Sequence, residues 1–186
     1  VGNRCANTVT TAGDNTALGA DAFRNGTGSS NTAIGHSALK ASTANDNTAV
    51  GKNALVANTS GTFNTALGFD ALKTATTVHS NTAIGTRSLE IATGGYNTCV
   101  GKDSGRTITS GSNNLCLGRD AEPSSATTSN EITLGDSNIT KFRVPGLNFS
   151  IKDSTATDNY VLTVDANGDA GWEAAGGGPG TGESDG

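Results

Sequence analysis

The sequence predicts an all-β fold, a parallel β-solenoid or β-roll of about eight coils with 16–17 residues in each. Three observations lead to this prediction: small residues dominate the composition, one short motif recurs at a nearly constant interval, and large apolar side chains are scarce. The scarcity also predicts that several copies associate, with a homotrimer as the expected state. A β-hairpin is expected to cap the carboxyl end of the solenoid.

The composition excludes the common alternatives. Thr, Gly, Ala and Asn supply a little over half of the 186 residues, whereas hydrophobic residues make up 33% and aromatic residues 4%. A compact globule requires many large apolar side chains to offset a backbone ordering cost of roughly 1–2 kcal/mol per residue. Disordered chains usually combine low hydrophobicity with a high net charge, but the net charge here is only -5. Gly, Thr and Asn are mediocre or poor helix formers, so a regular β structure remains.

The motif Asn-x-x-aliphatic-Gly recurs along most of the chain. Its copies begin at Asn15, Asn31, Asn47, Asn64, Asn81, Asn97 and Asn114, with a divergent copy at Glu131. They end at Gly19, Gly35, Gly51, Gly68, Gly85, Gly101, Gly118 and Gly135, so consecutive copies lie 16 or 17 residues apart. This interval is too short for a helix pair, and it fits one solenoid coil with two short strands and two turns. The repeats therefore occupy residues 15–140.

Each position of the motif has an expected place in the coil. The Asn can hydrogen-bond backbone groups in a turn and stack as an amide ladder between coils, and the Gly turns the chain where a positive φ or a close approach is needed. The residue before each glycine is a branched aliphatic, and stacking predicts an apolar ladder inside the solenoid at Leu18, Ile34, Val50, Leu67, Ile84, Val100, Leu117 and Leu134. A second apolar column follows five residues later at Phe23, Leu39, Leu55, Leu72 and Leu89; it lapses at Gly105 and Glu122 and returns at Ile139.

Two apolar side chains per coil make a thin core. Because side chains alternate along a strand, the Ala or Cys before each aliphatic residue is expected on the opposite face. A column of small residues there would let another chain pack closely, so we expect copies to associate around a shared axis. Eight coils at about 4.8 Å per coil predict a rod of roughly 40 Å.

The ends of the chain differ from the repeats. Residues 1–14 are a lead-in, and the start at Val1 without a signal peptide suggests a fragment or processed form. Residues 141–175 are richer in large side chains and are expected to form a β cap or connector, with an alternating segment at 160–164 and a second strand that carries Trp172. Residues 176–186 are rich in Gly and resemble a linker.

No nucleic acid or membrane partner is expected, because the acidic chain has no Lys/Arg run and no apolar stretch near the roughly 20 residues of a membrane span. No metal site is predicted, since Cys5, Cys99 and Cys116 form no metal-binding pattern. No catalytic residue or cofactor is predicted either, since His36 and His79 have no nearby pairing of a carboxylate with a nucleophile. Asp165, Asn167 and Asp169 echo the start of a calcium loop. Ala170 and Gly176 stand where that loop has Gly and Glu, so a β-turn is favoured.

Other residues leave alternatives open. Cys99 and Cys116 fall at the same position of consecutive coils, which permits a disulfide, although the Ala found there in other coils favours simple filling of space. His36 and His79 fall in turns and are expected to be exposed. The residues that follow each glycine, His36 and Lys52 among them, form a column that is either a solvated surface or a contact for a cell-surface glycan.

The repeats at residues 15–139, with Ala before the aliphatic residue and Gly after it, resemble the head repeats of trimeric autotransporter adhesins of the YadA type. The resemblance implies a left-handed parallel β-roll with three chains per head. Repeats of this longer form are similar to those in the tail fibres and appendages of tailed phages.

The function expected from these features is a structural shaft in a virion tail fibre or appendage, or in an extracellular adhesin at a cell surface, that takes part in host attachment. A polysaccharide-degrading tailspike is the alternative, because carboxylates from different coils can assemble a site. An ice-binding solenoid is a third reading, suggested by the Thr column at Thr16, Thr32, Thr48, Thr65, Thr82 and Thr98.

Overall fold

A computed structural model of the chain describes residues 3–6, 13–143, 160–164 and 170–174. It divides into two compact units, Val1–Lys141 and Phe142–Gly186, each of which is considered by itself. All regular secondary structure in the described residues is β, as the sequence predicts. No helix in this part of the chain is long and apolar enough to cross a membrane.

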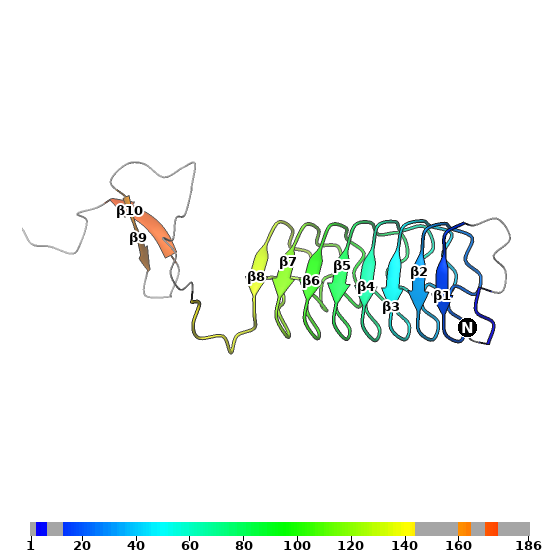
Figure 1. Cartoon of the computed structure of the whole chain (residues 1–186). Helices are drawn as coiled ribbons and strands as arrows, with labels where there is room; N and C mark the ends of the chain where they lie inside the picture. The colour runs from blue at the N-terminus through cyan, green and yellow to red at the C-terminus, as the bar shows by residue number, and fades with distance from the viewer. Residues whose placement is uncertain (1–2, 7–12, 144–159, 165–169, 175–186) are drawn as a thin grey trace, which may run out of the picture. The chain divides into compact units, whose positions relative to one another are not determined.

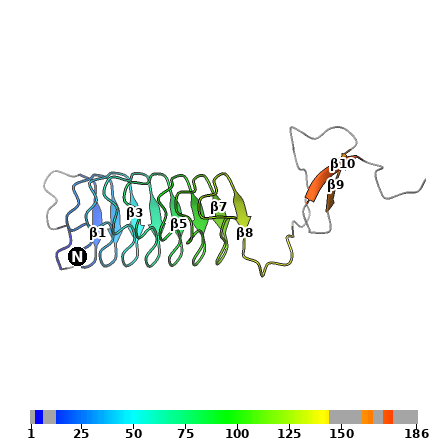
Figure 2. The ribbon, with the colours of Figure 1, turned by 180° about the vertical axis from the view of Figure 1, so that it is seen from behind.

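The first unit is a parallel β-solenoid with one three-residue strand in each coil (Figure 1). Its eight strands form one sheet in sequence order, and the view from behind shows the connecting loops stacked in an equally regular row (Figure 2). At about 4.8 Å per strand the sheet is roughly 34 Å long. The strands are β1 (Thr16–Leu18), β2 (Thr32–Ile34), β3 (Thr48–Val50), β4 (Thr65–Leu67), β5 (Thr82–Ile84), β6 (Thr98–Val100), β7 (Leu115–Leu117) and β8 (Ile132–Leu134).

The pairing keeps every motif position in register. Thr16 pairs with Thr32, Ala17 with Ala33 and Leu18 with Ile34, and the same pattern continues to β8. Coils of 16 or 17 residues therefore place the same motif positions in register, because the extra residue is absorbed between strands. The predicted stacking of the repeats is confirmed.

The prediction that the aliphatic ladder lies inside the solenoid was wrong. The ladder is continuous, but it lies on the outside of the solenoid, where Leu18 is 48% exposed and Leu134 is 46% exposed. The small residues occupy the interior instead: Ala33 is 1% exposed and Cys99 is fully buried. The reason is the thinness of the coil, since the second apolar column fills the interior and leaves room for only a methyl or thiol group opposite. The column of small residues is therefore not a surface for another chain.

The second apolar column forms the core, as predicted. Its members are fully buried: Phe23, Leu39, Leu55, Leu72 and Leu89. At Gly105 the space is filled by Ile108, which is also fully buried and lies three residues later in the same coil. The expected return of the column at Ile139 was wrong, because that side chain is 60% exposed.

Each coil bends at residues in the left-handed conformation, so the second strand expected in each coil does not form. The core column shows φ of 45–50° at its Leu and Phe residues, for example 47° at Phe23 and 50° at Leu55. Bulky residues rarely adopt this conformation, which costs roughly 1–2 kcal/mol. Burying a Leu or Phe side chain contributes about 1.5–3 kcal/mol, so the burial offsets the strain and aims the side chain inward.

Residues 3–6 repeat the backbone of residues 20–23. Arg4 and Ala6 have φ of 55° and 45°, close to the 57° of Asp21 and the 47° of Phe23. Two backbone hydrogen bonds hold this stacking: the N–H of Asp21 donates to the carbonyl of Asn3, and the N–H of Ala6 donates to the carbonyl of Ala22. Part of the segment treated as a lead-in thus stacks on the first coil as a further turn of the solenoid.

The second unit contains the antiparallel pair β9 (Tyr160–Val164) and β10 (Ala170–Ala174). Trp172 pairs with Leu162, which matches the predicted hairpin whose second strand carries the tryptophan. The suggested calcium-like segment 165–169, the residues 144–159 and the linker 176–186 lie outside the described residues.

Candidate functional site

The outer face of the sheet is a continuous strip of Thr and aliphatic side chains. In strands β1 to β6 the first residue is Thr and the third is aliphatic, and both point away from the core because the middle residue points inward. In β7 and β8 the Thr is replaced by Leu115 and Ile132, so the strip becomes wholly apolar at that end. Monomeric soluble proteins rarely expose contiguous apolar patches larger than about a few hundred Å². This strip is the first candidate for an interaction surface.

The Asn residues that open each repeat form a buried ladder. The Oδ1 atom of Asn81 accepts the backbone N–H of Asn97 at 2.9 Å, and its Nδ2 atom donates to the carbonyl of Gly94 at 3.1 Å. The same Oδ1 contact to the backbone of the next coil recurs from Asn15 through Asn114, where Glu131 supplies the last N–H. From Asn31 onward these side chains are at most 2% exposed. Their hydrogen-bonding groups are engaged within the fold, so they act as structural residues that hold the coils together.

Two features require glycine at the end of the motif: a positive φ and a close approach to the backbone of the next coil. Gly19 has φ of 128°, and a Cβ added to it would lie 2.8 Å from the carbonyl carbon of Gly35 in the next coil. The same overlap with the backbone of the following coil recurs through Gly101, and a Cβ on Gly118 would lie 3.0 Å from the Cα of Gly135. Any larger residue would push neighbouring coils apart, so the predicted turn role includes close packing between coils.

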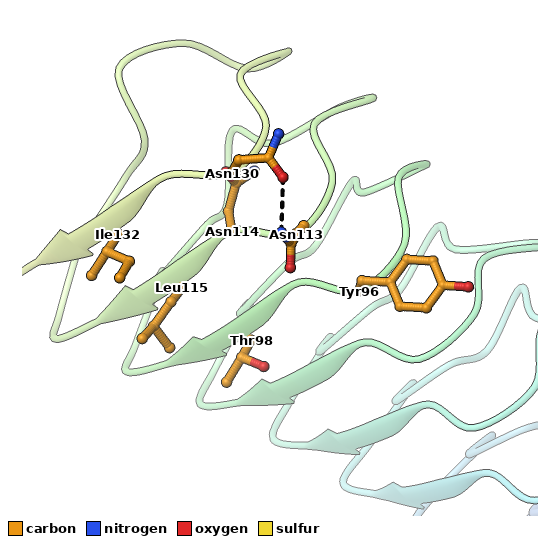
Figure 3. Close-up of a pocket in the computed structure, with 7 residues that line it drawn as sticks. All are labelled: Tyr96, Thr98, Asn113, Asn114, Leu115, Asn130 and Ile132. Atoms are coloured by element: carbon orange, nitrogen blue, oxygen red, sulfur yellow. Dashed lines mark hydrogen bonds between the residues drawn. The ribbon is translucent and has the colours of Figure 1, made fainter. Parts of the chain in front are cut away.

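A shallow hollow lies at the amino ends of β6, β7 and β8 (Figure 3). Its volume is about 370 Å³, and its lining consists of Tyr96, Thr98, Asn113, Asn114, Leu115, Asn130 and Ile132. None of these side chains carries a formal charge. Tyr96, Asn113 and Asn130 occupy the same position of three consecutive coils, two residues before the strand, and all have φ near 60°.

The polar groups of this hollow differ in how fully they are engaged. Asn114 belongs to the buried ladder, since its Nδ2 donates to Thr128 and its Oδ1 accepts from Glu131. Asn113 and Asn130 are exposed and make one side-chain contact, a hydrogen bond of 2.8 Å from Nδ2 of Asn113 to Oδ1 of Asn130 (Figure 3). This leaves an acceptor on Asn113 and a donor on Asn130 open to solvent.

The basic side chains gather on the edge that follows the motif glycine. Every Lys and Arg in residues 13–140 lies one, two or five positions after that glycine: Arg24, Lys40, Lys52, Lys73, Arg87, Lys102, Arg106 and Arg119. Because the coils are in register, these residues stack along one edge of the solenoid. Lys52 also lies over the ring of Phe69, with Nζ 5.9 Å from the centroid.

Ion pairs on this edge join consecutive coils. Arg87 donates from Nε and Nη2 to the two oxygens of Asp103 at 2.7 and 2.9 Å. The hydrogen bond from Arg87 holds the pKa of Asp103 below its ordinary value. Burial acts to raise the pKa of Asp70, but hydrogen bonds from Lys73 and Asn53 outweigh it and leave that pKa lowered. Much of the edge is therefore occupied by its own pairs, and its first role is to fix the stacking of coils.

A second hollow of about 550 Å³ lies beside β8 and is lined by Asp120, Glu122 and Asp136 among others. Desolvation raises the pKa of Glu122, yet its carboxylate already accepts the N–H and hydroxyl of Thr107. Asp136 accepts two hydrogen bonds from Asn138. These carboxylates are engaged by neighbours, and no group of His, Cys, Asp and Glu suited to a metal ion occurs in the residues that the structure describes.

The remaining candidates from the sequence are two cysteines and two histidines. Cys99 and Cys116 are register partners on β6 and β7, fully buried and unbonded. The thiol–thiol contact with Cys116, together with burial, raises the pKa of Cys99. His36 is exposed, and His79 is exposed with its Nδ1 against the backbone N–H of Thr62 at 3.1 Å. The exposure expected for both histidines is confirmed.

Comparison with known proteins adds no relative. No protein-family model matches the chain. No curated protein and no solved structure matches it either.

The hollow at Tyr96 was missed by reasoning from the sequence. Its signal was available as three departures from the repeat that fall together: an aromatic at position 96, the Asn pair 113 and 130, and apolar residues in place of Thr at 115 and 132. Each departure alone is unremarkable in a variable loop. Only the register of the coils places them side by side.

Proposed function

We propose that this chain is the structural shaft of a homotrimeric fibre, in a virion tail fibre or appendage that takes part in host attachment. The observation that carries the proposal is the outward aliphatic strip on an otherwise well-stacked solenoid. The resemblance of the repeats to trimeric adhesin heads and phage fibres agrees with it.

The strip is suited to burial against other copies of the chain. Its exposed members include Leu67 at 43% and Leu117 at 38%, and they recur at one position in every coil. A closed symmetric assembly lets each copy bury the same strip. A threefold axis parallel to the solenoid brings the aliphatic columns of three copies together along their length, which supplies the large apolar core that the single chain lacks.

The stacking within each chain is suited to a rigid spacer. Each coil joins the next through in-register strand pairing and the buried Asn ladder. Ion pairs such as Arg87–Asp103 join some neighbouring coils in addition. Repeat proteins of this kind are stabilised by contacts between neighbouring units. Length can therefore change by whole coils while the local structure persists.

A deletion of whole coils tests the spacer role. Removing residues 32–97 joins Asn31 directly to Thr98 and deletes strands β2 to β5. Small-angle X-ray scattering should show a particle of the same oligomeric state that is shorter by roughly 19 Å, four times the strand spacing. Loss of assembly or aggregation of this in-register deletion would contradict a spacer function. A deletion of residues 32–98, which removes one further residue and so moves Cys99 and Val100 to the opposite faces of their strand, serves as the control and should be much less stable.

A further inference from the structure

We propose that the hollow at the amino ends of β6 to β8 binds a neutral sugar that carries a methyl group, such as an N-acetylated or 6-deoxy hexose. This inference deepens the proposed function and rests on it, because it names the chemistry that a shaft involved in attachment would contact. The hollow is defined by Tyr96, Asn113, Asn130, Leu115 and Ile132, together with Thr98 and Asn114.

Tyr96 supplies an aromatic surface. Its side chain is 66% exposed, at a position two residues before the strand where most coils carry small polar residues. Aromatic rings combine a large apolar face with, in tyrosine, a polar tip. The apolar C–H face of a sugar ring can lie on such a surface while its hydroxyl groups remain available for hydrogen bonds. Stacking of a sugar ring therefore gives a reason for a large aromatic side chain to be exposed beside the hollow.

Asn113 and Asn130 supply the polar contacts. Their mutual hydrogen bond fixes both amide planes and leaves Oδ1 of Asn113 and Nδ2 of Asn130 free among the described contacts. An amide offers both donor and acceptor groups. Neighbouring sugar hydroxyls both donate and accept, so an amide pair with one free acceptor and one free donor matches them.

The floor of the hollow differs from the rest of the sheet. The first strand residue is Thr in β1 to β6, but it is Leu115 in β7 and Ile132 in β8. Ile132 is 68% exposed, more than any residue of the outward aliphatic column for which exposure is given. These apolar groups fit a methyl substituent better than another hydroxyl. The change from Thr to apolar residues occurs in the two coils that carry Asn113 and Asn130, and the coil before them carries Tyr96 and keeps Thr98.

The electrostatics of the hollow favour a neutral ligand. No lining side chain is charged, and the nearby Glu131 carboxylate is held by Ser124 at 2.7 and 2.9 Å. The volume of about 370 Å³ lies at the lower end of the range for small-molecule sites. An open hollow of this size binds weakly by itself, and repetition in an oligomer raises the effective affinity by multivalency.

The hollow lies at the amino margin of the strip, whereas the aliphatic column lies at the carboxyl end of each strand. Packing of copies through the aliphatic column therefore leaves this margin at the rim of the interface. Occupation of the hollow by a second copy is an outcome that sedimentation distinguishes from sugar binding.

The test uses saturation-transfer NMR on the full chain with N-acetylglucosamine and fucose as probes and glucose as the comparison sugar. We expect transfer to the methyl groups of the first two sugars, and weaker or no transfer to glucose. Tyr96→Asn should weaken binding by about tenfold, since it removes the stacking surface. Asn already occupies this position in the next two coils, so the change suits the left-handed backbone. Tyr96→Phe should retain most of the binding.

Phe63 provides a matched control. It is 63% exposed at the same position two coils earlier, and the next coil carries Ser80 rather than Asn. Phe63→Asn should leave sugar binding unchanged. Equal loss in Phe63→Asn and Tyr96→Asn, or no transfer to any probe, would overturn the site.

Sedimentation of the same samples separates this inference from the proposed function. A trimer that binds none of the sugars overturns the sugar site and leaves the shaft intact. A monomer that binds them through Tyr96 supports the site and overturns the trimeric shaft. If only a variant that cannot assemble binds the sugars, a second copy covers the hollow and the inference is wrong.

Discussion

Gly105 lies against the sulfur of Cys99, so closely that a methyl group on Gly105 would overlap that sulfur. Gly105 occupies the position where other coils carry a core Leu or Phe, and Cys99 occupies a position that is Ala in earlier coils. The two departures compensate each other: the thiol and Ile108 fill the volume that the missing Leu leaves. The core of this coil is thus repacked around a glycine.

Gly105→Ala should destabilise the solenoid by at least about 2 kcal/mol, because the added methyl overpacks the core at a residue in the left-handed region. Chemical denaturation monitored by circular dichroism measures the loss. Gly13→Ala is the matched control, since a Cβ there meets nothing within 4 Å, and it should change stability little. Adding Cys99→Ala to Gly105→Ala should recover about 1 kcal/mol or more through coupling of the two sites. Strictly additive effects would contradict the proposed contact.

Asn81→Ala should cost about 2–4 kcal/mol, because it leaves the buried N–H of Asn97 and the carbonyl of Gly94 without their partner. The same denaturation experiment measures this cost. Asn25 is exposed and its side chain has no hydrogen bond within the described residues, so Asn25→Ala serves as the comparison. Similar stabilities for the two variants would show that the ladder contributes nothing.

Cys99 and Cys116 should resist alkylation in the folded protein. Both are fully buried, and the pKa of Cys99 is raised by its contact with Cys116 and by burial, so its reactive thiolate is disfavoured. Mass spectrometry after a pulse of iodoacetamide should find both thiols unmodified in the native state and modified in denaturant. Rapid native labelling, or a disulfide in the untreated protein, would contradict the buried thiol pair.

Stability should fall in acid. The folded-state pKa values of Asp70 and Asp103 lie below their ordinary values, so the unfolded chain binds protons first as the pH drops. Their contribution is complete above about pH 4, the range of an unperturbed Asp, and is lost as the pH falls through the folded-state pKa values. The pKa of Glu122 is raised, so the folded chain binds this proton first, and the contribution of Glu122 to stability becomes more favourable as the pH falls.

Melting temperatures between pH 7 and pH 3 test this dependence. Asp103→Asn should flatten the acid limb of the curve, and Glu122→Gln should not. A curve for Asp103→Asn that parallels the wild type would show that the Arg87–Asp103 pair makes no pH-dependent contribution.

The repeat interval was sufficient to predict the solenoid, its register and the buried second column from Phe23 to Leu89. It was insufficient to predict which strand face is inside, because alternation places Ala33 and Ile34 on opposite faces without saying which faces inward. The tendency of large apolar side chains to be buried favours Ile34 as the inward residue. The structure reverses this, since a coil already filled by Leu39 has space only for Ala33. The hollow at Tyr96 required knowledge of how three separate loops align.

The outward position of Ile34, Val50 and Ile84 is the basis of the proposed assembly. Analytical ultracentrifugation of the chain at micromolar concentration tests it most directly, with Val50→Lys/Ile84→Lys as the variant that places charges on the strip. Thr59→Lys, at an exposed loop position, is the control. The wild type and the control should sediment with the mass of three chains, and the strip variant as a folded monomer with an unchanged circular dichroism spectrum. A wild-type chain that sediments at its single-chain mass of 18.5 kDa would contradict the account.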